Sequence, residues 1–81
     1  MTQESYRPIP CIQHERLEFA ALRRTPLLLT YEAGGERVSA SVQVLDVYTR
    51  DGAEWLSVSD EAGKEAVIRL DQIVEFQERP L

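Results

Sequence analysis

The chain has one cysteine and one histidine, Cys11 and His14, which stand three positions apart. At this spacing a thiol and an imidazole can approach each other at the start of a helix. A catalytic pair also needs a hydrogen bond between the two groups and a third group that orients the ring, and no Asn or Asp nearby is evident in that role. Two ligands are too few for a structural zinc site. We therefore expect neither catalysis nor metal binding here, and the simpler interpretation packs Cys11 under the helix as a small apolar residue.

Two other groups could take part in catalysis or ligand binding: the neighbouring carboxylates Asp60 and Glu61, and the glycine pair Gly34-Gly35. A general acid needs burial or a like-charged neighbour in a pocket to shift its pKa, whereas a polar turn leaves both carboxylates solvated. The glycine pair falls in a hairpin turn and does not open a helix, as a phosphate-binding loop would. We predict that the protein is not an enzyme and takes no cofactor.

Acidic side chains outnumber basic ones by 14 to 9, and the excess lies in the second half of the chain. Residues 1–50 hold six acidic and six basic side chains, whereas residues 51–78 hold eight acidic and two basic. An acidic surface repels phosphates and attracts basic partners, so free nucleic acid is a poor first candidate for a partner. A simpler alternative is that the negative charge only keeps a small protein soluble.

An RNA-binding module is a second alternative, because small five-stranded barrels often bind RNA through a basic groove with exposed aromatic side chains. Tyr31 and Tyr48 are better explained by packing within strands, where aromatic residues are enriched. The chain has one lysine, Lys64. A weakly basic side could be formed by Arg23, Arg24, Arg37 and Arg50.

The length of 81 residues allows one domain, which we place at residues 11–78. A single cysteine excludes an intramolecular disulfide. The first residues lack the basic region and apolar run of a signal peptide, and no apolar stretch is long enough to span a membrane. We expect a cytoplasmic protein.

A helix is predicted over residues 13–24, after an extended arm at residues 1–10 that contains two prolines. Leu17, Ala20 and Ala21 recur at helical spacing and share one face, with Phe19 and Leu22 on its flank. The helix should end before Pro26, since proline disfavours helical geometry in the residue that precedes it.

The remaining sequence predicts five strands, at about residues 27–32, 37–48, 54–59, 65–70 and 73–77, followed by a frayed tail at 79–81. Apolar residues alternate with polar ones from Val38 to Val44, and then the alternation slips so that Leu45 and Val47 become the apolar positions. A slip of this kind inside a long strand indicates a bulge or a sharp bend. The predicted fold is mainly β: a small, bent, five-stranded antiparallel barrel with an N-terminal α-helix.

Four short stretches carry a resemblance that extends over almost the whole chain: Tyr6-x-Pro8-Ile9-x-Cys11, Leu17-Glu18-x-Ala20, the strand at 27–31 with its glycine turn, and Arg69-Leu70-Asp71-x-Ile73. As an ordered set with this spacing they resemble the Rof family of Rho-binding antiterminators. The resemblance implies an Sm-like fold and a monomer. It also implies a partner protein, the transcription termination factor Rho, whose RNA-binding N-terminal region the family obstructs.

The resemblance further implies that the helix and the loop between the third and fourth strands contact the partner. An acidic surface suits this role, because a groove that binds RNA is basic. The alternative for each such residue is an ordinary solvated charge. One departure from the family is the start of the helix, at residues 12–16, which has fewer acidic residues and contains Arg16. The implied contact residues are Gln13, Glu15, Glu18, Asp60, Glu61 and Glu65.

Overall fold

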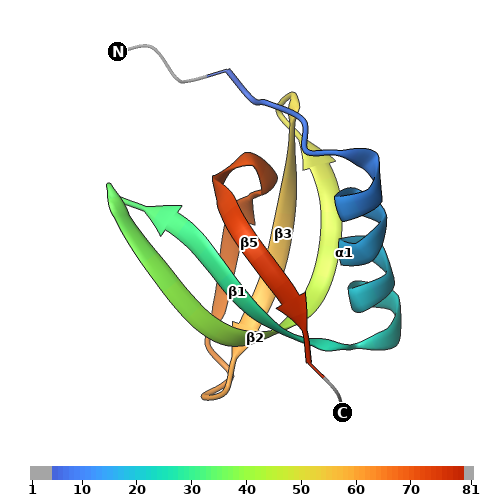
Figure 1. Ribbon diagram of the computed structural model, residues 1–81, viewed down its shortest axis with the longest axis vertical. Helices are drawn as coiled ribbons and strands as arrows, with labels where there is room; N and C mark the ends of the chain where they lie inside the picture. Colours follow the sequence, from blue (N-terminus) through green and yellow to red (C-terminus); the bar gives the residue numbers. More distant parts are fainter. Residues whose placement is uncertain (1–4, 80–81) are drawn as a thin grey trace.

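The computed structural model describes residues 5–79 as one α-helix and five antiparallel strands in a single bent sheet (Figure 1). The fold class is therefore as predicted, mainly β with an N-terminal helix. Residues 5–10 of the predicted arm precede the helix without regular secondary structure, and residues 1–4 lie outside the described part. In chain order the elements are α1 (Cys11–Arg23), β1 (Pro26–Ala33), β2 (Glu36–Arg50), β3 (Ala53–Asp60), β4 (Glu65–Arg69), the 3-10 turn η1 (Leu70–Gln72) and β5 (Ile73–Glu78).

Helix α1 begins two residues earlier than predicted, directly after Pro10. The carbonyl oxygen of Pro10 accepts hydrogen bonds from the backbone N–H groups of Gln13 and His14, at 3.0 and 3.1 Å. Arg24 ends the helix in the left-handed conformation, with a φ of 56°, and the N–H of Thr25 closes the last turn onto the carbonyl of Ala20.

Strand β2 is the longest element and belongs to both halves of the sheet. The strand order is β4-β3-β2-β1-β5. The first part of β2 pairs with β1 and its second part pairs with β3, and the two sets of partners overlap only near Val42 and Gln43. The register with β3 shifts between Val44 and Asp46, so that Leu45 is the extra residue of a bulge. The bulge predicted from the slip in apolar alternation is confirmed.

The two edge strands of the sheet, β4 and β5, are joined by η1 alone. Only four peptide steps separate Arg69 from Ile73, and a chain of that length spans at most about 14 Å. The sheet must therefore curl until its edges approach each other at this end. Among residues 5–79 no ladder joins β4 to β5, so the sheet is strongly bent but not closed.

The hydrophobic core lies inside this bend, with α1 packed mainly against β2. The helix contributes Leu17 and Ala20, whereas Phe19 and Leu22 point to solvent. Cys11 is also exposed, so the interpretation that packs it under the helix is wrong. It lies six positions before Leu17, about 120° around the helix from the buried face. The buried cluster consists of Leu17, Ala20, Leu27, Leu29, Val42, Val44, Leu56, Val58, Ile68 and Leu70.

Arg16 ties α1 to the end of β5. Its Nε and Nη2 donate to Oε2 and Oε1 of Glu78 at 2.9 and 2.5 Å, and its guanidinium lies 4.4 Å from the centroid of the Phe76 ring. The paired hydrogen bonds raise the pKa of Arg16 and lower the pKa of Glu78. The last strand of the sheet is thereby held to the only α-helix of the described chain.

Replacement of Glu78 by Gln is expected to lower the free energy of unfolding at pH 7 by at most about 1 kcal/mol, because the pair is partly exposed. Because folding lowers the pKa of Glu78, the ionised carboxylate stabilises the fold above the ordinary glutamate pKa of about 4.3. This contribution is lost as the pH falls through the lower pKa of the folded state. Urea unfolding of wild type and Glu78→Gln should show a difference at about pH 7 that shrinks towards pH 3.

The matched control is Glu75→Gln, on the same strand, because the side chain of Glu75 makes no hydrogen bond or ion pair within residues 5–79. It should leave the free energy of unfolding close to that of wild type at both pH values. A stability difference for Glu78→Gln that stays constant with pH would contradict the pairing.

Candidate functional site

The six residues implied as partner contacts are all exposed, and they lie on two separate elements. Gln13, Glu15 and Glu18 are on α1, whereas the other three lie at the turn from β3 to β4. In Figure 1 this turn is at the lower end of the sheet and α1 runs along its side. The structure therefore presents two groups of side chains and not one cluster.

Asp60 has a structural task in the turn. Its Oδ1 accepts hydrogen bonds from the backbone N–H groups of Ala62 and Lys64, both at 2.9 Å. Backbone hydrogen bonds from Asp60 to Lys64 and from Gly63 to Asp60 complete the turn, and Gly63 has a φ of 83°. This is the local side-chain to backbone bonding that makes aspartate common in turns. A change at Asp60 would alter the shape of the turn as well as its charge.

Glu61 and Glu65 differ from Asp60, because neither carboxylate makes a hydrogen bond or ion pair within the described chain. Both side chains are exposed on either side of the turn. On the helix, Glu15 is likewise exposed and unpaired among residues 5–79. These three carboxylates keep their charge available for a basic partner.

Glu18 belongs to a chain of polar contacts centred on His14. The Nδ1 atom of His14 lies 3.1 Å from Oε1 of Glu18, and its Nε2 atom lies 2.5 Å from Oε2 of Glu54 on β3. The other oxygen of Glu54 accepts a hydrogen bond from the hydroxyl of Tyr6 at 2.9 Å. Burial and this hydrogen bond raise the pKa of Tyr6. The network joins the arm, the helix and β3.

These contacts also bear on the chemistry of the cysteine–histidine pair. Both nitrogens of His14 face carboxylate oxygens, so neither is free to take a proton from Cys11. The orienting groups that the sequence does not reveal are Glu18 and Glu54, which approach from the helix and from a strand. Among residues 5–79 no three His, Cys, Asp or Glu side chains are placed to hold a metal ion.

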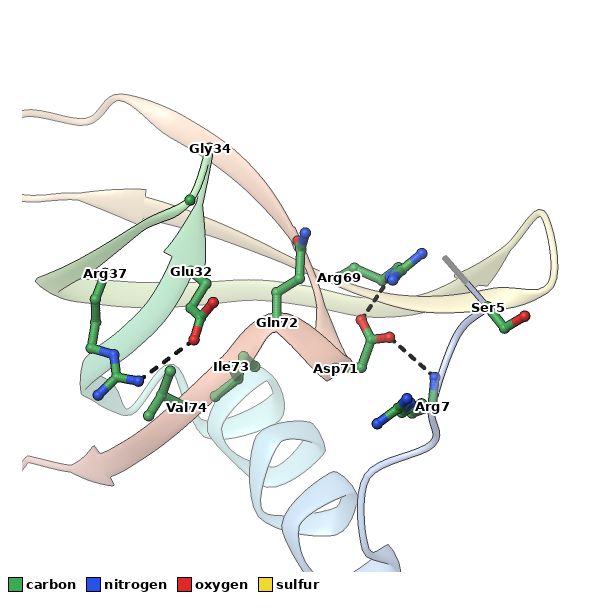
Figure 2. Close-up of a pocket in the computed structure, with 11 residues that line it drawn as sticks. Ser5, Arg7, Glu32, Gly34, Arg37, Arg69, Asp71, Gln72, Ile73 and Val74 are labelled. Carbon is green, nitrogen blue, oxygen red and sulfur yellow. Dashed lines mark hydrogen bonds and ion pairs between the residues drawn. The ribbon is translucent and has the colours of Figure 1, made fainter. Parts of the chain in front are cut away.

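A second contact fastens the arm to the 3-10 turn η1 (Figure 2). Asp71 accepts a hydrogen bond from Nε of Arg69 at 2.6 Å through Oδ1, and one from the backbone N–H of Arg7 at 3.1 Å through Oδ2. The guanidinium of Arg69 lies 6.0 Å from the centroid of the Tyr6 ring. The arm is thus held at two successive residues, Tyr6 and Arg7, shortly before the start of α1.

Next to this contact lies an open cavity of about 730 Å³ between the arm, the β1–β2 hairpin and the start of β5 (Figure 2). It contains three arginines from different elements, Arg7, Arg37 and Arg69. Two of them face carboxylates, since Arg37 lies 3.5 Å from Glu32 and Arg69 is bound to Asp71. No aromatic residue lines the cavity within the described chain, so it lacks the stacking surface of a site for single-stranded RNA.

The arginines that the RNA-binding alternative would need do not come together elsewhere either. Arg23 lies over Phe19 on α1, Arg50 is 3.9 Å from Asp51 in the β2–β3 turn, and Arg37 lines the cavity described above. These three arginines are on separate elements, and each has an aromatic or acidic neighbour. The fourth, Arg24, follows Arg23 directly at the C-terminal cap of α1.

A smaller cavity of about 510 Å³ connects the β3–β4 turn with the segment that follows α1. Asp60 and Glu61 line it together with Pro26 at the start of β1. Arg79 crosses this region: its backbone N–H donates to the carbonyl of Pro26 at 2.9 Å and its Nη1 to Oγ of Ser41 at 2.6 Å. Of the predicted frayed tail, Arg79 is therefore bonded to the sheet, and residues 80–81 lie outside the described part. The turn and the start of β1 therefore line the same cavity.

The outer face of α1 carries exposed apolar side chains, two of which, Phe19 and Leu22, were predicted only to flank the buried face. Ile12, Phe19 and Leu22 are exposed by 67, 54 and 79%. Their positions could have been recognised, because they fall on one side of the helix once Leu17 and Ala20 are assigned to the core. The acidic residues of the helix therefore stand beside an exposed apolar stripe.

Comparison with known proteins places this arrangement in a family. The profile of the ROF family, described as Modulator of Rho-dependent transcription termination, matches residues 8–80. A search of curated protein sequences found no match. Within residues 5–79, no helix combines the length and hydropathy that a bilayer crossing requires. The family match covers the end of the arm from Pro8, the helix, all five strands of the described chain and both groups of acidic side chains, and the chain therefore belongs to the ROF family of modulators of Rho-dependent transcription termination.

Proposed function

We propose that the protein binds Rho directly and obstructs the RNA-binding N-terminal region of Rho through its acidic surface, so that termination is suppressed. Membership in a family that modulates Rho-dependent termination supports Rho as the partner. We further propose that it acts as a monomer, without catalysis, in the bacterial cytoplasm where transcription takes place.

The observation that carries this proposal is the set of unpaired carboxylates on α1 and at the β3–β4 turn. Glu15, Glu61 and Glu65 are exposed, and within the described residues no cation neutralises them. A surface that binds RNA must be positively charged, because neutralisation of phosphates supplies much of the affinity. Exposed carboxylates compete for such a surface by the same Coulombic attraction.

The separation of the two acidic groups is compatible with one partner. A standard protein interface buries about 800 Å² on each side, which corresponds to a patch about 28 Å across. The described chain measures 41 × 25 × 18 Å. One interface of ordinary size is thus comparable with the width of the described chain, and we propose that it covers part of α1 together with the β3–β4 turn.

Arg16 stands among the acidic residues of α1 in the sequence, but its positive charge does not reduce the negative charge available to the partner. Its guanidinium is bound to both oxygens of Glu78 and lies over Phe76. Its positive charge is thus compensated within the molecule. The proposed contact therefore depends on the remaining acidic residues of the helix and on the turn.

The test is a competition experiment with purified Rho and a fluorescently labelled oligoribonucleotide. We expect the protein to displace the RNA from Rho, and the apparent affinity to fall steeply between about 50 and 200 mM salt. Failure to displace RNA at the lowest salt concentration would overturn the proposal.

The RNA-binding alternative is tested in the same experiment by adding the labelled RNA to the protein without Rho. We expect no binding, because two of the three arginines in the cavity face carboxylates and no aromatic residue of the described chain lines it. Tight RNA binding by the protein alone, lost on changing Arg37, would favour the alternative.

A further inference from the structure

The exposed apolar residues of α1 lie on the face that points away from the core. Ile12, Phe19 and Leu22 lie at relative positions 0, 7 and 10 of the helix and are separated by at most about 80° around its axis. Single exposed apolar residues are ordinary on a protein surface, but three on one helix face mark a surface that a partner can cover.

Carboxylates border this stripe. Glu15 and Glu18 line a shallow cavity of about 350 Å³ together with Phe19 and Leu22. The Phe19 ring also accepts a cation, since the guanidinium of Arg23 lies 5.4 Å from its centroid. The helix thus places an aromatic ring next to two negative charges.

A nucleotide has the same combination of groups, a flat aromatic base beside a negatively charged phosphate. Proteins that bind single-stranded nucleic acid use cationic side chains for the phosphates and aromatic side chains that stack on the bases. A groove of that kind is complementary to a helix face that offers carboxylates and a phenyl ring.

We propose that α1 imitates a nucleotide in the RNA-binding groove of Rho: the Phe19 ring takes the place of a base against an aromatic or arginine side chain. Glu15, together with Oε2 of Glu18, whose other oxygen faces His14, takes the place of phosphate oxygens. The inference rests on the proposed function and adds the chemistry of the surface that α1 contacts. The binding free energy then has two contributions: that of the carboxylates depends on the salt concentration, and that of the Phe19 ring does not.

The experiment measures the affinity for Rho of wild type, Phe19→Ala, Phe19→Tyr and Glu15→Gln over a range of salt concentrations. Phe19→Ala is expected to weaken binding by roughly 10- to 100-fold, the effect typical of losing one stacked aromatic ring, and to leave the salt dependence unchanged. Phe19→Tyr should bind as wild type does. Glu15→Gln should reduce the salt dependence.

Val74→Ala is the matched control, because Val74 is an exposed apolar residue on β5 at the arginine-lined cavity, away from α1. It should bind Rho as wild type does. Urea unfolding should show that all variants remain folded, as expected for exposed positions.

The outcomes separate this inference from the function on which it rests. If wild type fails to bind Rho, the proposed function is wrong. If wild type binds and Phe19→Ala binds equally well, the nucleotide imitation is wrong and the acidic surface alone suffices. If wild type sediments as a dimer that Phe19→Ala dissociates while Rho binding is unaffected, the stripe is a self-association surface and the inference is also overturned.

Discussion

Replacement of Glu15, Glu61 and Glu65 by lysine is expected to weaken binding to Rho by roughly 100-fold at low salt. Each reversal removes an attraction and adds a repulsion, and single exposed charge pairs contribute about 0.5 kcal/mol. Six such terms amount to about 3 kcal/mol, and each 1.4 kcal/mol changes the affinity about tenfold. The three residues suit this test, because their carboxylates make no contacts within residues 5–79 that the change would break.

The control is a triple variant with the same change in net charge at other places, Glu32→Lys, Glu36→Lys and Glu75→Lys. These residues are exposed on β1, β2 and β5. If affinity depends on where the charges lie, the control variant should bind Rho far more tightly than the variant changed at Glu15, Glu61 and Glu65. Equal losses in both variants would mean that net charge alone is responsible, and the location of the site on α1 and the β3–β4 turn would be wrong. Asp60 is left unchanged because its side chain builds the turn.

Leu17→Ala is expected to lower the free energy of unfolding by about 3 kcal/mol, the midpoint of the range for a buried leucine. Leu17 is fully buried and is the largest side chain that α1 contributes to the core. A domain of this length has a total stability of about 4 to 12 kcal/mol, so the substitution removes a large share of it. Urea unfolding monitored by circular dichroism measures the loss as a lower midpoint.

Leu22→Ala provides the same chemical change on the same helix at a side chain that is 79% exposed. It should alter the free energy of unfolding by less than about 0.5 kcal/mol. A similar loss of stability for Leu17→Ala and Leu22→Ala would contradict the orientation of α1 on the sheet.

Local patterns in the sequence were sufficient to predict the elements and the bend. The alternation from Val38 to Val44 shows which side of β2 is buried, and the slip at Leu45 locates the bulge. These features depend on neighbouring residues and on the two-residue period of a strand. The predicted start of the helix, at residue 13, was wrong. The carbonyl of Pro10 accepts hydrogen bonds from the first turn, so the helix starts at Cys11.

Contacts between distant parts of the chain could not be predicted in this way. His14 meets Glu54 from β3, and Arg16 meets Glu78 at a separation of 62 residues. No periodicity connects such positions, since their proximity depends on how the sheet curls. The role of Asp60 was readable, because an aspartate followed by a glycine three residues later is typical of a turn. The family resemblance implied which acidic residues contact the partner. The structure shows in addition that Asp60 and Glu18 have partners within the protein. The carboxylates of Glu15, Glu61 and Glu65 have none within residues 5–79.

The pairing of β1 with β5 has a consequence for folding. β1 and β5 are the first and last strands of the described chain, and β5 completes the hydrogen bonding of β1 while Glu78 fixes α1 in place. Contacts between residues so distant in the sequence make folding slow for a chain of this size. Until β5 has paired, the outer edge of β1 has no partner strand among residues 5–79, so this edge is open to pairing with another chain during folding.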